Sequence, residues 1–172
     1  GCCGLSAVDD ARRVAQKLDI PYYVMNFKAD FQRDVIDYFV RSYVKGCTPN
    51  PCIACNRHVK WESLLQRSLT IGADYIATGH YARIENNLLK SAVDKSKDQS
   101  YFLANIEPEM LSRIIFPLGE WLKTDVKKMA SSYPQIASLA TQSESSEICF
   151  VENSYIDVFN ILTKKRNLNC VR

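Results

Sequence analysis

Apolar side chains recur at helical spacing in three stretches of the first half of the chain, residues 6–18, 31–46 and 61–72. Steps of three and four positions place the apolar side chains of each stretch on one face, which predicts three amphipathic helices. Ser6 is the predicted N-cap of the first helix, because its hydroxyl can accept a hydrogen bond from a first-turn amide. Gly72 is predicted to close the third helix, since glycine takes the left-handed conformation at little cost.

Shorter apolar runs at residues 21–27 and 73–80 alternate with these helices and are predicted as buried strands, the second running into a glycine turn. Alternation of helix and strand favours a parallel sheet with helices on its faces, so the predicted fold class is α/β. Residues 82–93 predict a hairpin at the edge of that sheet, because Asn86 and Asn87 tolerate the left-handed conformation of a tight turn.

The second half of the chain shows weaker periodicity. Helices are predicted at residues 107–113, from about Thr124 onward, and at residues 154–163. A polar stretch separates the last two helices and leads into a short strand-like run at residues 147–151. We therefore place a domain boundary near residue 141, with residues 1–141 as one unit and residues 142–172 as a second segment.

The composition is that of a globular protein, since 47% of the 172 residues are hydrophobic and 24% are charged. No apolar run approaches the roughly 18 residues that span a bilayer. The first ten residues, GCCGLSAVDD, resemble no leader peptide, so we expect a cytoplasmic protein without a membrane partner. A net charge of +3 permits a nucleic-acid partner without requiring one.

Seven cysteines, an odd number, favour reduced thiols with chemical roles over a secreted disulfide framework. The segment TPNPCIACNRHVKW, residues 48–61, is predicted as a proline-stiffened loop running into a helix, and it carries Cys52 and Cys55. A Cys-x-x-Cys pair can hold a metal, tune a thiol or form a redox disulfide. Zinc is disfavoured because there is no second such pair, although His58 and Cys149 keep it open. Cys149 alone is equally compatible with an inert buried thiol.

Three polar segments are expected at the carboxyl ends of strands, where open parallel sheets bind ligands: residues 46–56, 78–80 and 97–99. Each also has a simpler interpretation. Residues 78–80 suit a structural turn with a hydrogen-bonded His80, and residues 97–99 suit a helix cap with solvated charges. The basic side chains that suit the solvent-exposed face of a helix are Arg57, His58 and Lys60.

Seven stretches follow one another in a distinctive order: GCC, DARRVAQKLDIPYYVMNF, TPNPCIACNRHVKW, GADYIATGHYARI, KDQSYFL, FPLGE and SSEICFV. Together they closely resemble the tRNA-specific 2-thiouridylases, which replace the C2 oxygen of the wobble uridine by sulfur. The resemblance implies a Rossmann-like α/β domain of the ATP-pyrophosphatase type in residues 1–141. It also implies that residues 142–172 hold the persulfide cysteine and the start of a central tRNA-binding domain.

The same resemblance implies roles for individual residues. Cys55 matches the nucleophilic cysteine of the PNPxxxC loop, Cys149 the cysteine that carries a persulfide, and Gly79 an ATP-binding position. Asn50, Pro51 and Cys52 match the stretch that meets the target base of the tRNA. Other tRNA-contacting positions are matched by His80, Lys97, Asp98 and Gln99.

The implied chemistry uses ATP with Mg²⁺ to adenylate the C2 oxygen, which turns it into a good leaving group. Sulfur carried on Cys149 then attacks C2, or Cys55 releases it as hydrosulfide and forms a disulfide with Cys149. The implied partners are tRNA and a protein that donates the persulfide sulfur. Arg57 and Lys60 are candidates for phosphate contacts.

The chain departs from this family in two respects. The family's glycine- and serine-rich phosphate loop and its C-terminal β-barrel domain are not found in these 172 residues, and the chain starts without Met, so we expect an inactive fragment. Many relatives carry an Asp at the position of Cys52. If Cys52, Cys55 and Cys149 converge, they form a thiolate set that suits a [4Fe–4S] cluster with one open iron. Otherwise Cys52 is a spare thiol that lowers the pKa of Cys55 or exchanges disulfides with it.

Two other functions remain open. A different ATP-pyrophosphatase that adenylates another substrate would have no need for Cys149. A non-catalytic tRNA-binding or metal-binding module would bind its partner without any persulfide chemistry.

Overall fold

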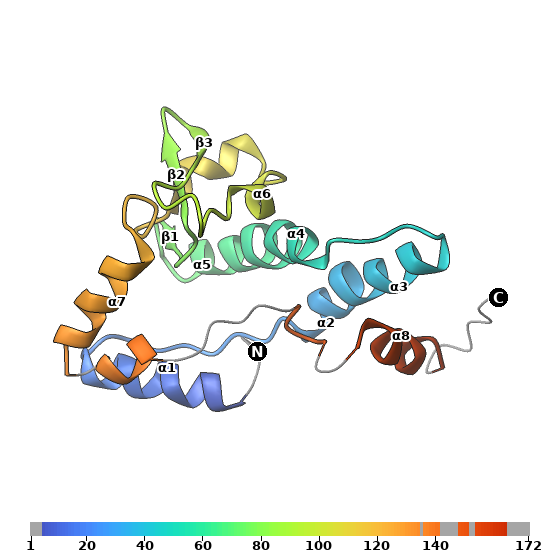
Figure 1. Cartoon of the computed structure of the whole chain (residues 1–172), viewed down its shortest axis with the longest axis horizontal. Helices are drawn as coiled ribbons and strands as arrows, with labels where there is room; N and C mark the ends of the chain where they lie inside the picture. Colours follow the sequence, from blue (N-terminus) through green and yellow to red (C-terminus); the bar gives the residue numbers. More distant parts are fainter. Residues whose placement is uncertain (1–4, 135, 142–147, 152–153, 165–172) are drawn as a thin grey trace.

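The structure, a computed structural model, describes residues 5–134, 136–141, 148–151 and 154–164. A long helical run crosses the middle of the molecule. Two small sheets lie on one side of it, and α1 (Leu5–Lys17) and α8 (Tyr155–Lys164) lie on the other (Figure 1). Within the described ranges, no helix combines the length and the apolar character that a membrane crossing requires.

The helix α1 confirms the first predicted helix, with one correction at its start. It begins at Leu5, so Ser6 lies inside its first turn and is not the N-cap. The helix ends before the predicted breaker Pro21, because Asp19 adopts a φ of 53° and turns the chain away from the helix axis.

The prediction of a buried strand at residues 21–27 is wrong. The segment has no regular secondary structure, and Tyr23 and Val24 are 69% and 64% exposed. A strand needs a neighbour that exchanges backbone hydrogen bonds with it, and the strand pairs among the described residues lie elsewhere. The segment is instead fastened to the central helix by Arg67, which donates to the Asn26 carbonyl oxygen at 2.9 Å.

The second predicted helix is confirmed as a continuous helical run. It consists of α2 (Lys28–Phe31), a π-helical segment (Gln32–Ile36) and α3 (Asp37–Val44). Its inward face buries Phe39. Gly46, with a φ of 75°, follows the end of the run as predicted.

The central helix consists of α4 (Pro51–Ala54), a 10-residue π-helical segment (Cys55–Leu64) and α5 (Leu65–Thr70). The predicted loop is therefore wrong from Pro51 onward, because the chain is helical there. Asn50 is the N-cap: its side-chain oxygen accepts a hydrogen bond from the Ile53 amide at 3.3 Å. Proline suits the first helical position, where its missing amide costs nothing, so the Asn-Pro pair starts a helix here.

The main core packs against the inward side of the central helix. Trp61 is fully buried there, and Gly72, with a φ of 89°, closes the helix as predicted. The strands and the connections between them supply the rest of the apolar cluster. Its buried members are Trp61, Leu65, Ile76, Ala82, Leu103, Ile106, Leu111, Ile114 and Phe116.

The strand predicted at residues 73–80 is confirmed in a shorter form, β1 (Ile76–Ala77). It pairs in parallel with β4 (Ile114–Ile115), which lies far along the chain. The connection between them includes α6 (Ser100–Leu103) and a 3₁₀ segment (Pro108–Arg113), which confirms the helix expected near residue 107. Parallel strands joined through helical segments are the α/β arrangement that the alternating pattern predicts.

The predicted hairpin is confirmed as β2 (Ala82–Glu85) and β3 (Leu88–Ser91), with φ values of 52° and 58° at Asn86 and Asn87. It forms its own antiparallel sheet, so its expected place at the edge of the parallel sheet is wrong. A loop occupies the flank of β2 instead: a Cβ atom on Gly119 would collide with the carbonyl oxygen of the first β2 residue.

The later helices are confirmed, but one of them differs in burial. The helix α7 (Lys123–Ser132) begins next to the predicted Thr124, and α8 covers most of residues 154–163. None of the residues of α7 is buried, and Met129 is 42% exposed, so its expected apolar face packs only loosely.

The strand expected at residues 147–151 is a turn in its described part, residues 148–151. The Val151 amide donates to the Ile148 carbonyl oxygen at 2.9 Å and closes this turn. A short apolar run forms a strand only beside another strand, and no described strand lies next to this one. Residues 142–147, which adjoin the predicted domain boundary, lie outside the described residues.

Candidate functional site

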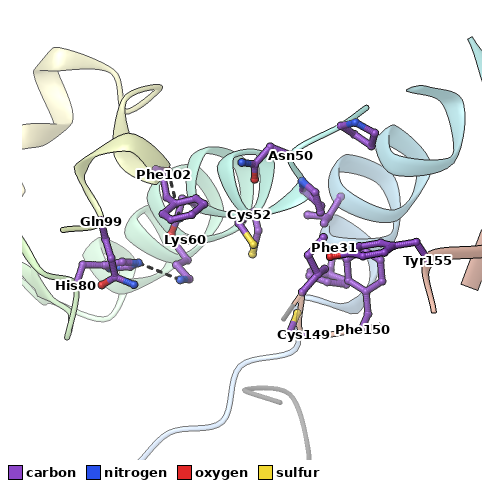
Figure 2. Close-up of a pocket in the computed structure, with 16 residues that line it drawn as sticks. Phe31, Asn50, Cys52, Lys60, His80, Gln99, Phe102, Cys149, Phe150 and Tyr155 are labelled. Atoms are coloured by element: carbon purple, nitrogen blue, oxygen red, sulfur yellow. Dashed lines mark hydrogen bonds between the residues drawn. The ribbon is translucent and has the colours of Figure 1, made fainter. Parts of the chain in front are cut away.

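A cavity of about 500 Å³ opens between the start of the central helix, the helical run after residue 27 and the turn at residues 148–151 (Figure 2). It gathers segments that are far apart in the sequence. The predicted site residues that line it are Asn50, Pro51, Cys52, Cys55, His80, Gln99 and Cys149. The predicted site residues that are not among its lining are Gly79, Lys97 and Asp98.

The cysteines reach this cavity from two directions. Cys52 and Cys55 lie in the first turns of the central helix, three positions apart and therefore on neighbouring parts of one face. Cys149 lies in the turn across the cavity, and Figure 2 shows it on the wall that faces Cys52. All three are half-buried and none of them forms a disulfide.

A ready-made metal centre is not part of this arrangement. Among the described residues, no three His, Cys, Asp or Glu side chains lie together in a group that could hold a metal ion. Cys52, Cys55 and Cys149 thus share the cavity without being gathered into the ligand set expected for a [4Fe–4S] cluster, and His58 does not complete a zinc site with them.

His80 links the end of β1 to the central helix. Its Nδ1 lies 2.7 Å from the Thr78 hydroxyl oxygen, and its Nε2 lies 3.4 Å from the Lys60 ammonium nitrogen. Burial, together with the nearby charge of Lys60, lowers the pKa of His80 to about 4. The imidazole is therefore neutral at pH 7, so Nε2 accepts from Lys60 while Nδ1 donates to Thr78.

Gly79 directly follows β1, where a parallel strand pair presents its carboxyl end. This is the edge at which open α/β sheets bind nucleotides. A Cβ atom at this position would meet only Leu118, at an ordinary contact distance of 3.7 Å. Gly79 thus lies at this edge, and no neighbouring atom crowds its backbone.

Asp98 and Gln99 brace the loop before α6. Asp98 accepts hydrogen bonds at 2.7 Å from the Ala92 amide and at 2.7 Å from the Ser100 hydroxyl. Burial opposes ionisation of Asp98, but these hydrogen bonds outweigh it and lower its pKa. The Gln99 amide donates to the Tyr81 carbonyl oxygen at 2.8 Å, and its side-chain oxygen accepts from the Tyr81 amide at 3.0 Å. These contacts hold Gln99 beside His80 (Figure 2).

The basic side chains of the central helix separate into two groups. Arg57 is paired with Glu62 at 3.3 Å and with Glu107 at 2.8 Å, and His58 contacts Glu62 at 2.8 Å. These two suit the solvated face that the sequence suggests. Lys60 instead lines the cavity.

Sequence reasoning missed Asn56 and the aromatic wall of the cavity. Asn56 is 5% exposed and donates to the Phe102 carbonyl oxygen at 3.2 Å, which ties the central helix to α6. Phe150 lies edge-on to Phe31 at 5.9 Å and to Phe39 at 5.3 Å between ring centres. The apolar stripe at residues 31–39 predicts a buried helix face. It does not predict the contacts with Phe150, because no local signal shows which side chain a buried ring will pack against.

The parallel pair of β1 and β4, joined through helical segments, makes this an α/β protein. The cysteines that line the cavity give it a candidate thiol site. Residues 1–153 match the profile of the family described as the tRNA methyl transferase HUP domain. The chain belongs to this family, which confirms the Rossmann-like α/β class and the resemblance drawn from the sequence motifs.

Two curated relatives of the chain carry the same name. The chain is 58% identical over 161 residues to the tRNA-specific 2-thiouridylase MnmA of Lachnoclostridium phytofermentans, a match that covers 90% of this chain and 44% of the relative. It is 50% identical over 165 residues to the enzyme of that name from Campylobacter hominis, covering 96% of this chain and 45% of the relative. The chain thus spans about half the length of the curated relatives it matches.

Proposed function

We propose that the chain carries the catalytic cysteines of a tRNA-uridine 2-sulfurtransferase, an enzyme that thiolates the wobble uridine with the help of ATP. The observation that carries this proposal is that Cys52, Cys55 and Cys149 line one cavity, although Cys149 comes from a distant segment. The names of the relatives support it. A methyl transfer, which the family's description mentions, has no need for thiols on opposite walls.

The reaction has two stages. ATP, a substrate that arrives with Mg²⁺, adenylates the C2 oxygen of uridine, while pyrophosphate and the N3 proton leave. In the second stage the Cys55 thiolate attacks the Cys149 sulfur of a Cys149 persulfide, which forms a Cys55–Cys149 disulfide and releases hydrosulfide. Hydrosulfide replaces the adenylated oxygen at C2, AMP leaves, and a dithiol reductant reopens the disulfide.

The residues around the cysteines suit the binding of a base. The cap of Asn50 and the proline after it fix the start of the central helix, so Cys52 and Cys55 sit on a rigid element. Phe31, Phe102 and Phe150 line the same cavity, and aromatic faces can stack on a flipped-out uracil. We assign to tRNA contact the cavity residues Asn50, Pro51, Cys52, His80 and Gln99.

The remaining assignments rest on the family resemblance. Gly79 would contact ATP at the carboxyl end of β1, and Lys97 and Asp98 would contact tRNA outside the cavity. Residues 1–141 form the ATP-pyrophosphatase-type unit, and residues 142–172 carry Cys149 and begin a tRNA-binding domain. The sulfur comes from a donor protein that loads Cys149.

The test is the measurement of 2-thiouridine in tRNA incubated with the complete gene product that contains this chain, ATP and a persulfide donor. We expect product from the wild type and at least a hundredfold less from Cys55→Ser and Cys149→Ser. Cys47→Ser, a change at an exposed cysteine outside the cavity, is the matched control. An adenylated product without sulfur would indicate another ATP-pyrophosphatase, and tRNA binding without either product would indicate a non-catalytic module.

A further inference from the structure

The charge inside the cavity is unbalanced. Among the described residues that line it, Lys60 is the only Lys, Arg, Asp or Glu. The other lining side chains are aromatic, aliphatic, amide, imidazole or thiol groups. An ammonium in such a place attracts an anion, because no carboxylate among the described lining residues neutralises it and the apolar walls reduce solvent screening.

Lys60 is oriented by a neutral partner. Its Nζ donates to His80 Nε2 at 3.4 Å, and Thr78 holds the other ring nitrogen of His80 at 2.7 Å. The imidazole packs against both Trp61 and Phe116, with ring centres 6.1 and 6.0 Å away. This hydrogen bond fixes the direction of the ammonium and leaves its charge intact. A carboxylate partner would instead cancel that charge.

Arg57, three positions earlier on the same helix, shows the opposite arrangement. It is neutralised by two carboxylates, those of Glu62 and Glu107. Arg57 is thus engaged in ion pairs, while Lys60 on the same helix lines the cavity, where no other charged side chain is found among the described lining residues.

We propose that Lys60 is a catalytic residue that binds the phosphate of the adenylated uridine and stabilises AMP as it departs. This inference rests on the proposed function. In the step concerned, hydrosulfide adds to C2, the C2–O bond breaks, its electron pair leaves with AMP, and the hydrosulfide proton ends on N3. AMP thereby gains one negative charge, which the Lys60 ammonium meets.

The layout of the cavity suits this role. Figure 2 shows Lys60 and His80 on one side of Cys52, and Cys149 on the other. Sulfur would thus arrive from the Cys149 side, while the leaving phosphate faces the cation. A fixed cation matters most where charge develops in the transition state, and the loss of one such group typically slows a reaction about 10²–10³-fold.

The experiment separates the two chemical stages in the complete gene product, with ATP, tRNA and a persulfide donor. Single-turnover measurements follow pyrophosphate release, which reports adenylation, and 2-thiouridine, which reports sulfur transfer. The variants are Lys60→Met, which removes the charge at similar length, and Lys60→Arg, which keeps it. Lys128→Met is the matched control, because Lys128 is an exposed lysine of α7 that pairs with Asp125 at 3.5 Å.

We expect Lys60→Met to release pyrophosphate within threefold of the wild-type rate, to form 2-thiouridine about a hundredfold more slowly, and to accumulate adenylated tRNA visible by mass spectrometry. Lys60→Arg should recover part of the loss, and Lys128→Met should match the wild type. Unchanged thiolation in Lys60→Met overturns the inference, and so does a parallel loss of pyrophosphate release or of tRNA affinity. A wild-type protein that forms no 2-thiouridine would overturn the proposed function itself, before any variant is compared.

Discussion

The side-chain oxygen of Asn50 accepts a hydrogen bond from the Ile53 amide, and this contact begins the helix that presents Cys52 and Cys55 to the cavity. The distance is 3.3 Å. An N-cap satisfies an amide that the helix itself leaves without a partner. The position of two thiols thus depends on one amide side chain just before them.

Replacement of this cap should weaken the fold measurably. We expect Asn50→Ala to lower the free energy of unfolding by about 1 kcal/mol, since alanine cannot accept the hydrogen bond. Urea denaturation of the chain measures the change. Asn50→Asp is the control and should stay close to the wild type, because aspartate caps equally well; equal losses in both variants would exclude the capping role.

Two glycines should respond differently to the same substitution. Gly119→Ala places a Cβ atom against the backbone carbonyl of Ala82, so the loop or β2 must shift, and we expect a loss of about 1–3 kcal/mol in unfolding free energy. Gly79→Ala meets only the Leu118 side chain at 3.7 Å and should change stability by less than about 0.5 kcal/mol. Thermal denaturation of both variants tests the contrast, which fails if Gly79→Ala proves the more harmful.

His80 should make the fold sensitive to mild acid. Its pKa falls from 6.5 to about 4 in the folded chain, through burial and the charge of Lys60. Between these values the unfolded chain binds a proton that the folded chain refuses, so stability is retained above pH 6.5 and declines as the pH falls toward 4. From pH 7 to pH 5 the loss attributable to His80 is about 2 kcal/mol.

Urea denaturation at both pH values provides the measurement for this prediction. His80→Gln removes the titrating group and should flatten the pH dependence. His58→Gln, a change at the other histidine of the chain, should leave it in place. The explanation is wrong if the slope survives in His80→Gln. Asp94 and Asp98, whose pKa values are lowered by hydrogen bonds, contribute only at more acidic pH.

Cys55 and Cys149 should be linked by mild oxidation of the complete gene product in the presence of tRNA. Both line the cavity, and sulfur transfer between them requires contact. Peptide mapping by mass spectrometry identifies the linkage, and the exposed Cys47 serves as an internal control that should stay outside it. The two-cysteine route is refuted if the linkage is absent while Cys149→Ser keeps full thiolation activity.

Features set by local backbone preference could be predicted from the sequence. Gly46, Gly72, Asn86 and Asn87 all adopt positive φ angles at the predicted helix ends and hairpin turn. These positions depend on the residue itself and on its immediate neighbours, so tertiary structure does not override them.

Strand membership could not be predicted in the same way. Residues 21–27 and 148–151 are apolar enough for a strand, but a strand exists only where another one lies beside it. The loop predicted after Pro51 is wrong for a different reason. The Asn-Pro pair at Asn50 is a local signal for a helix start, and it is present in the sequence.

Only the parts of the candidate site that lie in recognisable sequence motifs could be predicted. The segments around Cys55 and His80 were expected at one edge of the sheet, and Cys149 joined them only through the family resemblance. The contact between Lys60 and His80 had no sequence signal, because it joins residues twenty positions apart through the course of the chain between them.

The π-helical segment from Cys55 to Leu64 has a consequence for helical phase. An α-helix advances about 100° per residue, so two side chains five positions apart point about 140° away from each other. A π-helix bonds residue i to residue i+5, and side chains five positions apart then lie on the same face, much as residues four apart do in an α-helix. Cys55 and Lys60, five positions apart, both reach the cavity under this underwound geometry. A return of the segment to α-helical winding would rotate the cation away from the thiol without changing a single side chain.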